Sequence, residues 1–223
     1  MEQRYERQIM VFGRSGQKKL RKSRIAIAGC GGLGSISAQY LAMAGVGFLR
    51  LIDSDKVEVS NLNRQFFNLS DIGKPKSHCL TKRILSLNPE TKIEAIKEKI
   101  TDKNSSRLIK DCDIVLDCLD NLETRLFLSD ACESLGKPLV HGSVDSLSGQ
   151  QITLLPGSGY LRRIFGNKVL QNKKIPVIGP LPGLIGALQA LEAIKLITGC
   201  GKPNQKLIIF DGEGNKIEHI KTQ

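Results

Sequence analysis

A glycine-rich turn follows the first apolar run of the chain, in residues 25–34, which read IAIAGCGGLG. Gly29, Gly31 and Gly34 have the spacing G-x-G-x-x-G of a dinucleotide-binding turn, and Gly32 adds a fourth glycine that this pattern does not require. Such a turn joins a strand to the N-terminus of a helix, where backbone N–H groups bind phosphate. We therefore expect a nucleotide site here, although the turn alone does not distinguish NAD from ATP.

An aspartate follows at the distance that a dinucleotide fold requires, about 20 positions beyond the glycine turn. Asp53 ends the apolar run FLRLID at residues 48–53, where it can accept hydrogen bonds from ribose hydroxyls. This role fits the adenosine of NAD and that of ATP. The structural alternative is a glycine turn that only packs a helix on a strand, with an aspartate at the strand end.

Two cations distinguish the nucleotides. Arg64 lies in the polar segment DSDKVEVSNLNRQ at residues 53–65, and Lys76 ends GKPK at residues 73–76. Backbone N–H groups largely satisfy the pyrophosphate of NAD, whereas breaking the α–β bond of a triphosphate spreads negative charge that Arg and Lys stabilise. The pair favours ATP, although each residue taken singly is typical of a solvated surface.

A further carboxylate follows the apolar run in DIVLDCLDN, residues 113–121. Because the carboxyl ends of parallel strands meet at one edge of a sheet, we expect Asp120 to face the same crevice as Asp53. One or two carboxylates plus phosphate oxygens typically bind Mg²⁺, so Asp120 is the candidate ligand. The alternative is that Asp120 caps the helix that begins near Leu122. Asp117, within the strand, is a weaker candidate.

Short apolar runs alternate with helical patterns along the chain. The predicted strands are 24–29, 48–53, 92–96, 113–118, 138–142 and 150–155. The predicted helices between them are 32–44, 75–87, 103–110 and 122–136. This alternation indicates an α/β protein with a Rossmann-like, doubly wound and mainly parallel sheet. Residues 207–211 and 216–220 predict a hairpin, an antiparallel C-terminal extension of that sheet.

We expect one domain over residues 1–223, beginning with a helical segment at 1–22. Residues 156–182 have no clear period and many Gly, Pro and Lys, so they indicate a long crossover loop of the kind that is usually functional or disordered. The nearly all-apolar run 182–198 predicts a buried helix at a subunit interface.

Composition narrows the class of protein. The chain has 223 residues, 40% of them apolar, with a formal net charge of +11 from 33 Lys and Arg against 22 Asp and Glu. A charged N-terminus and the lack of ~18 consecutive apolar residues indicate a cytoplasmic protein without a membrane span. The charge indicates an anionic partner, but the basic residues are spread along a chain without Trp, so nucleic acid is not expected. Six cysteines without a C-x-x-C pair predict neither zinc nor a disulfide framework.

The motifs together resemble one family. RYERQIMVFGRSGQKKL, GCGGLGS, SNLNRQ, GKPK, DCLDNLETR and PLPGLIGALQALEAIK follow one another as in the ThiF/MoeB/HesA adenylyltransferases, which are related to ubiquitin-activating enzymes. The resemblance covers nearly the whole chain. It implies that the protein uses ATP and Mg²⁺ to adenylate the C-terminal carboxylate of a small β-grasp sulfur-carrier protein ending in Gly-Gly, or of a peptide, with release of pyrophosphate.

The resemblance also implies residue roles. Arg64 and Lys76 are expected to be catalytic by neutralising the phosphates, and Arg7 to reach them from the partner subunit of a homodimer. Gly32 is expected to approach the nucleotide, and Asp120 to hold Mg²⁺. The expected ATP-binding set is Gly29, Gly31, Gly32, Asp53, Asp55, Ser60, Asn61, Leu62, Asn63, Arg64, Gln65, Lys76, Asp120 and Asn121.

The chain departs from many of these relatives, which carry two zinc-binding C-x-x-C pairs. Residues 157–165 and the C-terminus lack them, so no zinc is expected. Residues 156–182 contain no cysteine that could take over the acyl group, so the reaction is expected to end at the acyl-adenylate unless Cys200 or a partner supplies a thiol. The basic residues of the crossover suit an acidic carrier; they are Arg162, Arg163, Lys168, Lys173 and Lys174.

A carboxylate that attacks the α-phosphorus needs no base, so we expect His78, His141 and His219 to be structural. Three other functions remain open from the sequence. One is a tRNA-modifying dehydratase of the same superfamily, and the second is a catalytically silent subunit that docks a carrier protein. The third is an NAD-dependent oxidoreductase.

Overall fold

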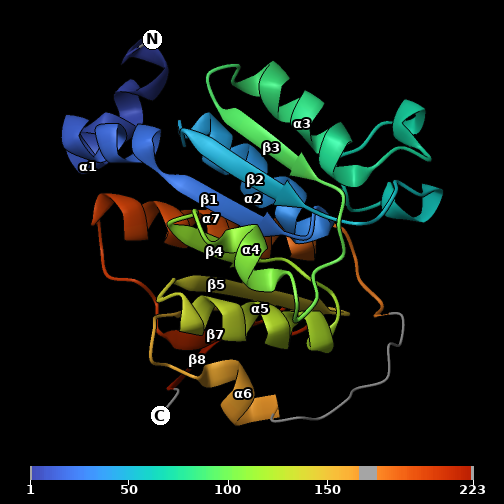
Figure 1. The fold of residues 1–223 in the computed structure, drawn as a ribbon. Helices are drawn as coiled ribbons and strands as arrows, with labels where there is room; N and C mark the ends of the chain where they lie inside the picture. The colour runs from blue at the N-terminus through green and yellow to red at the C-terminus, as the bar shows by residue number, and fades with distance from the viewer. Residues whose placement is uncertain (1, 166–174, 222–223) are drawn as a thin grey trace.

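The computed structural model describes residues 2–165 and 175–221, which form a sheet with helices on both faces (Figure 1). The sheet has eight strands in the order β3-β2-β1-β4-β5-β6-β7-β8. The first five pair in parallel: β1 (Arg24–Ala28), β2 (Phe48–Ile52), β3 (Lys92–Ile96), β4 (Ile114–Asp117) and β5 (Leu139–Asp145). The last three pair antiparallel: β6 (Ser148–Leu154), β7 (Lys206–Asp211) and β8 (Lys216–Lys221). The predicted doubly wound sheet with an antiparallel C-terminal extension is confirmed.

Helices connect and cover these strands. They are α1 (Glu2–Lys22), α2 (Gly32–Met43), α3 (Lys76–Leu87), α4 (Ser105–Ile109), α5 (Leu122–Ser134), α6 (Tyr160–Phe165) and α7 (Pro180–Thr198). Two short 3-10 helices, η1 (Val59–Asn61) and η2 (Leu69–Asp71), lie between β2 and α3. Figure 1 shows α2 and α7 behind the sheet and α4 and α5 in front of it. The helical segment expected at the N-terminus is present as α1, with a break at Gly13, where φ is 72°.

Alternating residues of β1 fill the two halves of the core. Ile25 and Ile27 pack into the cluster that contains α2 and α7 side chains, whereas Ala26 and Ala28 pack into the cluster of α4 and α5. Because successive side chains of a strand point to opposite faces, a central strand covered on both faces must be apolar throughout. This explains the uninterrupted run IAIA that leads into the glycine turn.

Gly29 is required by both backbone conformation and space. Its φ is 93°, and a Cβ at this position would lie 2.6 Å from the carbonyl oxygen of Cys118, at the end of the neighbouring β4. We expect Gly29→Ala to lower the free energy of unfolding by about 3 kcal/mol, because left-handed strain adds to a backbone clash. Urea denaturation measures this change.

Gly136→Ala provides the matched control. Gly136 also has positive φ, 61°, but a Cβ there would meet nothing within 4 Å. Only the conformational strain then remains, and we expect a loss of about 1 kcal/mol. Equal losses for the two variants would contradict the close approach of the turn to β4.

The segment 156–182, expected to be an irregular crossover, contains regular structure at both ends. Leu161 of α6 is buried in the core cluster beside α5, and Arg162 forms an ion pair with Asp130 of α5. At the other end, α7 begins at Pro180, two residues earlier than expected, because proline is well suited to the first turn of a helix. Lys168, Lys173 and Lys174 lie outside the described residues.

Among the described residues, one helix, α7, is long and apolar enough to span a bilayer by length and composition. Half of this apolar helix is buried within the protein, and Ile185, Ala190 and Ala193 belong to the core cluster. Packing between α2 and β5 therefore accounts for its composition. The helix predicted from the sequence is present and is half buried within the protein, and its place at a subunit interface stays a prediction.

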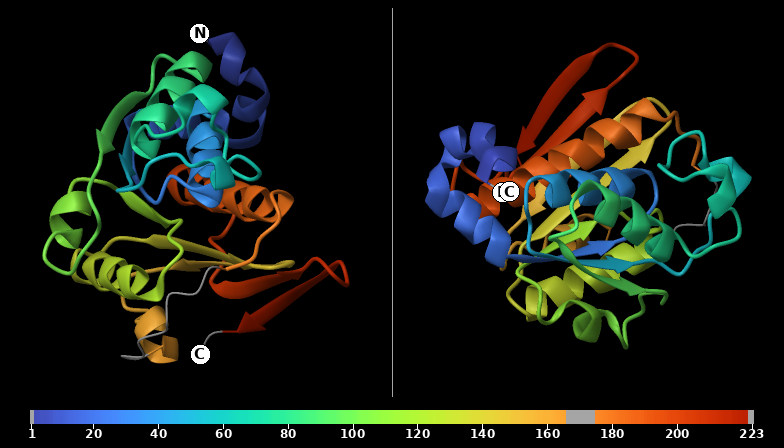
Figure 2. Two further views of the ribbon diagram at one scale, coloured as in Figure 1. Left: turned by 90° about the vertical axis from the view of Figure 1, so that its right-hand side faces the viewer. Right: turned by 90° about the horizontal axis from the view of Figure 1, so that it is seen from above.

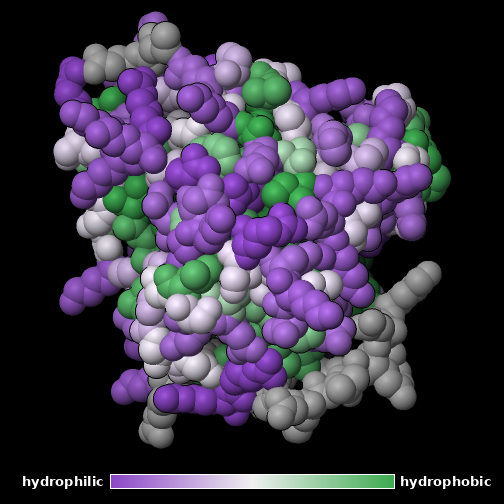
Figure 3. Space-filling model, in the orientation of Figure 1, coloured by the Kyte–Doolittle hydropathy of each residue, from purple (hydrophilic) through white to green (hydrophobic). Residues whose placement is uncertain are grey.

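The predicted C-terminal hairpin is confirmed as β7 and β8. It projects from the body of the molecule (Figure 2), and every residue of β8 is exposed. The surface seen in the orientation of Figure 1 is mostly hydrophilic, with small scattered apolar areas (Figure 3).

Candidate nucleotide site

The glycine turn is bound to the strand beside it. The backbone N–H of Gly29 donates to the carbonyl of Ile52 at 2.8 Å, and that of Cys30 donates to Oδ2 of Asp53 at 2.7 Å. Asp53 follows β2 directly, so the ends of β1 and β2 are joined where the turn begins. The two groups of residues that the sequence identified separately are thus in contact.

Asp53 is largely buried and holds two backbone groups. Its Oδ1 accepts from the N–H of Asp55 at 2.7 Å, while Oδ2 accepts from Cys30. Burial raises the pKa of Asp53, and the nearby Lys76 opposes that shift. Each carboxylate oxygen keeps a second lone pair, which is what binding of a ribose hydroxyl requires.

Lys76, in the first turn of α3, comes to the same place. Its side chain is only 9% exposed, and Nζ donates to Oδ2 of Asp55 at 2.9 Å. Its backbone N–H donates to the carbonyl of Asp55, and Pro75 pairs with Lys56 in an isolated bridge. The N-terminus of α3 is therefore fastened beside β2, and this places an ammonium group near the glycine turn.

The segment 58–65 is held mainly by its own contacts. Asn61 is buried, and its Oδ1 accepts from the N–H of Glu58 in a capping box around η1. The guanidinium of Arg64 donates to the carbonyl of Ser60 at 2.8 Å and to Oδ1 of Asn63 at 2.9 Å. The side chain of Arg64 is thus bound to its own loop. Contact with phosphate stays a prediction for the residues expected to line it here, which are Ser60, Asn61, Leu62, Asn63 and Arg64.

Gln65 faces the glycine turn directly. Its Nε2 lies 3.5 Å from the position of a Cβ on Gly31. Its Oε1 is buried without a hydrogen-bond partner among the described residues, as are the hydroxyls of Ser35 in α2 and Ser77 beside Lys76. An unpartnered buried polar atom costs about 1–3 kcal/mol. Gln65 and Ser35 both lie at the glycine turn, and unpartnered polar atoms there fit a site that is completed by a polar ligand.

Gly32 has a packing role that the sequence did not reveal. A Cβ at Gly32 would lie 2.8 Å from the Cβ of Pro182 in α7, and 3.5 Å from the carbonyl oxygen of Arg64. The extra glycine of the turn therefore lets α7 and the 58–65 loop approach α2. This explains its presence without a ligand, and its approach to a nucleotide stays a prediction.

The loop between β4 and α5 carries Asp120 on the surface. Asn121, not Asp120, is the N-cap of α5, and its Oδ1 accepts from the N–H of Thr124 at 3.0 Å. The alternative in which Asp120 caps this helix is therefore wrong. The side chain of Asp120 is exposed at the carboxyl edge of the sheet. Contact of Asp120 and Asn121 with a nucleotide or metal stays a prediction.

A buried polar cluster lies where the end of β4 pairs with His141 of β5, and sequence reasoning missed its organisation. Nδ1 of His141 lies 2.7 Å from Oδ2 of Asp117, and the guanidinium of Arg125 lies beside both side chains. Asp117 ends the otherwise apolar β4, and His141 is the third residue of β5, within the buried half of that strand. That interruption of both strands is the signal that the sequence offered.

His141 makes stability depend on pH. Burial lowers its pKa below 6.5 and outweighs Asp117, which raises it. Below pH 6.5 the unfolded chain binds a proton that the folded chain does not. The contribution of His141 to the free energy of unfolding is therefore complete above pH 6.5 and is lost as the pH is lowered, by at most about 1.4 kcal/mol per pH unit. We expect His141→Gln to flatten the slope of urea-unfolding free energy between pH 6.5 and about 5. His78→Gln, exposed on α3, is the control and should keep the wild-type slope.

Arg7 is not near this site within its own chain. It is exposed on α1, two residues after Tyr5, which hydrogen-bonds Asn88 at 3.0 Å and lies against Gly45, before β2 begins. The amino ends of parallel strands lie at the edge opposite their carboxyl ends. A role for Arg7 at the phosphates would therefore require a second subunit, and this stays a prediction.

The cysteines are free and buried, except for Cys200, which is half-buried. Burial raises the pKa of Cys30 well above its ordinary value, so the thiol in the glycine turn stays protonated. Cys30 is buried in the core cluster, where it is a packing residue. Among the described residues, no three His, Cys, Asp or Glu side chains gather as a metal-ligand set.

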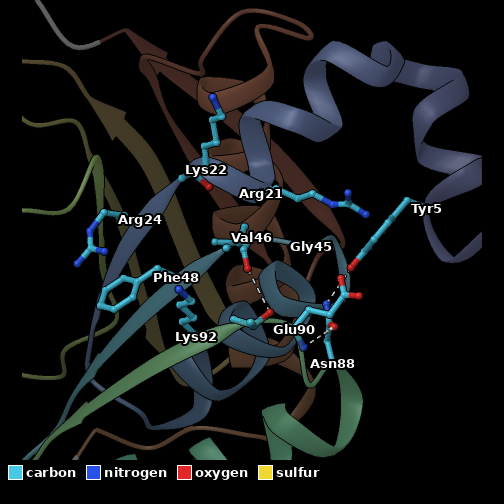
Figure 4. Close-up of a pocket in the computed structure, with 13 residues that line it drawn as sticks. Tyr5, Arg21, Lys22, Arg24, Gly45, Val46, Phe48, Asn88, Glu90 and Lys92 are labelled. Carbon is cyan, nitrogen blue, oxygen red and sulfur yellow. Dashed lines mark hydrogen bonds between the residues drawn. The ribbon is translucent and has the colours of Figure 1, made fainter. Parts of the chain in front are cut away.

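A cavity of about 430 Å³ lies at the amino edge of the sheet, away from the glycine turn (Figure 4). Phe48 and Lys92 are the first residues of β2 and β3, and both line it. Figure 4 shows Arg21 pointing toward Tyr5 and Lys22 extending away from it, so the basic side chains of this cavity do not converge on one point. The site predicted from the sequence is the separate carboxyl edge.

The fold and the glycine turn define a nucleotide-binding α/β protein. The model of the ThiF family matches residues 5–223, and the chain belongs to this family. It is 39% identical to the sulfur carrier protein ThiS adenylyltransferase of Escherichia coli K12, over 96% of this chain and 88% of that protein. It is 40% identical to the molybdopterin-synthase adenylyltransferase of the same organism, over 98% of this chain and 91% of that protein.

Other relatives are longer. The chain is 42% identical to the adenylyltransferase and sulfurtransferase MOCS3 of Drosophila yakuba and spans about half of that protein, 51%. Among solved structures, E. coli MccB with ATP matches with a TM-score of 0.88 at 24% identity, over 98% of this chain and 71% of that one. This last similarity concerns the fold alone. The family and enzyme class predicted from the sequence are confirmed by the named adenylyltransferases.

Proposed function

We propose that the protein is an ATP-dependent adenylyltransferase that activates the C-terminal carboxylate of a small sulfur-carrier protein or of a peptide. The observation that carries this proposal is the buried Lys76, held 2.9 Å from Asp55 beside the turn that Asp53 anchors. An ammonium group at a glycine turn is suited to a triphosphate. The ThiS and molybdopterin-synthase adenylyltransferases supply the reaction class.

The reaction needs positioning and charge neutralisation rather than a base. A carboxylate oxygen of the substrate forms a bond to the α-phosphorus, and the bond from that phosphorus to the oxygen bridging to the β-phosphate breaks. The electron pair leaves with pyrophosphate, and the product is an acyl-adenylate. Lys76 and Arg64 stabilise the charge on the phosphates as it moves, and Asp53 holds the ribose.

Asp120 is the proposed ligand for Mg²⁺. Its exposed carboxylate, at the carboxyl edge of the sheet, fits an ion that prefers oxygen ligands and takes only one or two carboxylates when phosphates supply the rest. A bound Mg²⁺ supplies further charge neutralisation at the phosphates. The cap that Asn121 makes on Thr124 fixes the main chain next to Asp120.

The proposed enzyme is a cytoplasmic homodimer. The outer faces of α2 and α7 expose large apolar side chains, with Tyr40 at 51% and Leu191 at 52% relative exposure, together with Met43 and Leu184. Four exposed large apolar side chains on two helices that pack together favour an interface there. A second subunit there is the proposed source of Arg7 for the phosphates.

We expect the wild-type chain to sediment as a dimer and Leu191→Glu to sediment as a monomer, because an interface cannot bury an unpaired carboxylate. Ile217→Glu is the matched control, since Ile217 is 62% exposed but lies on the projecting β8. Sedimentation velocity at equal concentrations makes the comparison. A monomeric wild type would contradict the proposed dimer.

The acceptor is proposed from the relatives. One is named for the sulfur carrier ThiS, and a solved neighbour, MccB, is titled with the peptide MccA. Every residue of β8 is exposed, and we propose that an acidic carrier contacts this strand of the hairpin. The net charge of +11 favours such a partner through electrostatic complementarity.

ATP–pyrophosphate exchange tests the proposal. We expect exchange with ATP, Mg²⁺ and a β-grasp carrier ending in Gly-Gly, and none when the carrier lacks its terminal glycine. Exchange supported by a peptide carboxylate instead would assign the peptide branch. ATP binding without exchange with any carrier or peptide would indicate the silent docking subunit, and activation of tRNA would indicate the dehydratase. Either of these two outcomes overturns the proposal.

A further inference from the structure

Asp117, His141 and Arg125 form a buried cluster directly beneath the loop that presents Asp120. Asp117 and His141 are register partners in the parallel ladder of β4 and β5, so their side chains leave the sheet on the same face. Their relative exposures are 0% and 2%, and Arg125 is 8% exposed. Three polar residues thus occupy a place that apolar side chains would normally fill.

The cluster holds both peptide groups of Leu119, the residue before Asp120. Oδ1 of Asp117 accepts from the N–H of Leu119 at 3.1 Å. Arg125, the fourth residue of α5, donates from its guanidinium to the carbonyl of Leu119. The main chain before Asp120 is therefore held by hydrogen bonds from a side chain at the end of β4 and from a side chain of α5.

Further contacts fix the positions of Asp117, His141 and Arg125 themselves. With its proton on Nδ1, His141 donates to Asp117, and the guanidinium of Arg125 lies 3.4 Å from both ring nitrogens of His141. Gln189 of α7 donates to the carbonyl of Asp117 at 2.7 Å. Burial alone raises the pKa of Asp117, but Arg125 and His141 outweigh it and hold that pKa below its ordinary value. The cluster therefore stays a single anion paired with a single cation.

We propose that Asp117, His141 and Arg125 are positioning residues that hold the β4–α5 loop so that the carboxylate of Asp120 is directed toward the metal and phosphates. The inference rests on the proposed function for the identity of what Asp120 binds. Beyond Leu119, Asn121 is fixed by its cap on Thr124, so Asp120 lies between two immobilised residues and only its side chain is free. Groups that orient a metal ligand in this way typically alter metal affinity when they are removed.

The test uses the full-length chain with Arg125→Lys and His141→Phe. We expect amide hydrogen exchange at Leu119 to become about tenfold faster in both, since a buried charged hydrogen bond is lost. We also expect the Mg²⁺ concentration for half-maximal ATP binding, measured by calorimetry, to rise about tenfold. ATP binding in EDTA should not change. Arg125→Lys keeps the charge and serves should His141→Phe fail to fold.

Glu192→Gln is the matched control, because it weakens another buried polar cluster. Oε2 of Glu192 accepts from Thr153 at 3.0 Å and from the N–H of Asn204 at 2.7 Å, away from the β4–α5 loop. This variant should lower thermal stability without faster exchange at Leu119 or a changed Mg²⁺ requirement. If Glu192→Gln reproduces either effect, the cluster is merely structural and the inference is overturned.

The two measurements separate the inference from the proposed function. If amide exchange at Leu119 is unchanged in the variants, Asp117, His141 and Arg125 do not hold the β4–α5 loop, and the inference is overturned regardless of the results on ATP binding. Faster exchange with an unchanged Mg²⁺ requirement overturns the link to Asp120. ATP binding by the wild type that does not depend on Mg²⁺, and that Asp120→Asn leaves unaltered, overturns the metal role in the proposed function. In that case the exchange measurement at Leu119 still tests whether the three residues hold the loop.

Discussion

Asp53→Ala should weaken ATP binding by about a hundredfold or more, because two charge-assisted hydrogen bonds that shape the site are lost with the proposed ribose contacts. The backbone N–H groups of Cys30 and Asp55 would lose their acceptor, and both point into the site from the loops that form it. Stability should fall as well, by about 2–4 kcal/mol. Calorimetric titration with ATP and Mg²⁺ and urea denaturation measure the two effects.

Asp113→Ala separates folding from binding. Oδ2 of Asp113 accepts from the backbone N–H of Arg24 at 2.8 Å, so this carboxylate also fastens β1, but at the opposite edge of the sheet. We expect a smaller loss of stability and unchanged ATP affinity. Asp53→Asn should be intermediate, since an amide oxygen replaces only part of the acceptor capacity. If Asp53→Ala bound ATP as tightly as Asp113→Ala, the nucleotide site would not lie at the glycine turn.

Lys76→Met should lower the rate of adenylate formation by about 10²–10³, the range typical for removal of one preorganised group that stabilises transition-state charge. The folding cost should be small, because the partner carboxylate of Asp55 is 61% exposed and returns to water when the lysine is lost. Single-turnover formation of the acyl-adenylate at saturating ATP measures the effect, and the melting temperature checks the fold.

Lys74→Met is the control for Lys76. Lys74 lies two residues earlier, is 52% exposed and pairs with Asp71 at 3.9 Å, so it carries the same charge outside the site. We expect a change of less than about twofold in rate, as is usual for an exposed ion pair. Lys76→Arg should restore little activity, because a guanidinium is bulkier and this position is buried. A rate for Lys76→Met within tenfold of wild type would contradict the catalytic assignment.

Strong local patterns made most of the fold predictable. The apolar run IAIA and the turn GCGGLG specify β1 and its turn, because the apolar residues of a buried strand and the glycine that adopts a positive φ follow one another directly in the chain. The boundaries of β2, β3 and α3 follow the predicted ranges closely for the same reason. The segment 156–182 was harder to predict, because α6 has only six residues and is held against α5 by Leu161 and Arg162 rather than by an apolar period of its own.

By itself, then, the sequence determined the doubly wound sheet, the glycine turn and Asp53, since each depends on residues close together in the chain. The tertiary structure alone decided which distant groups meet. It paired Lys76 with Asp55, packed Gly32 against Pro182 and placed Arg7 at the far edge from the turn. It also brought Asp117, His141 and Arg125 together beneath Asp120. Such contacts join residues that are far apart in the chain, so the local patterns that predict single strands and helices do not reveal them.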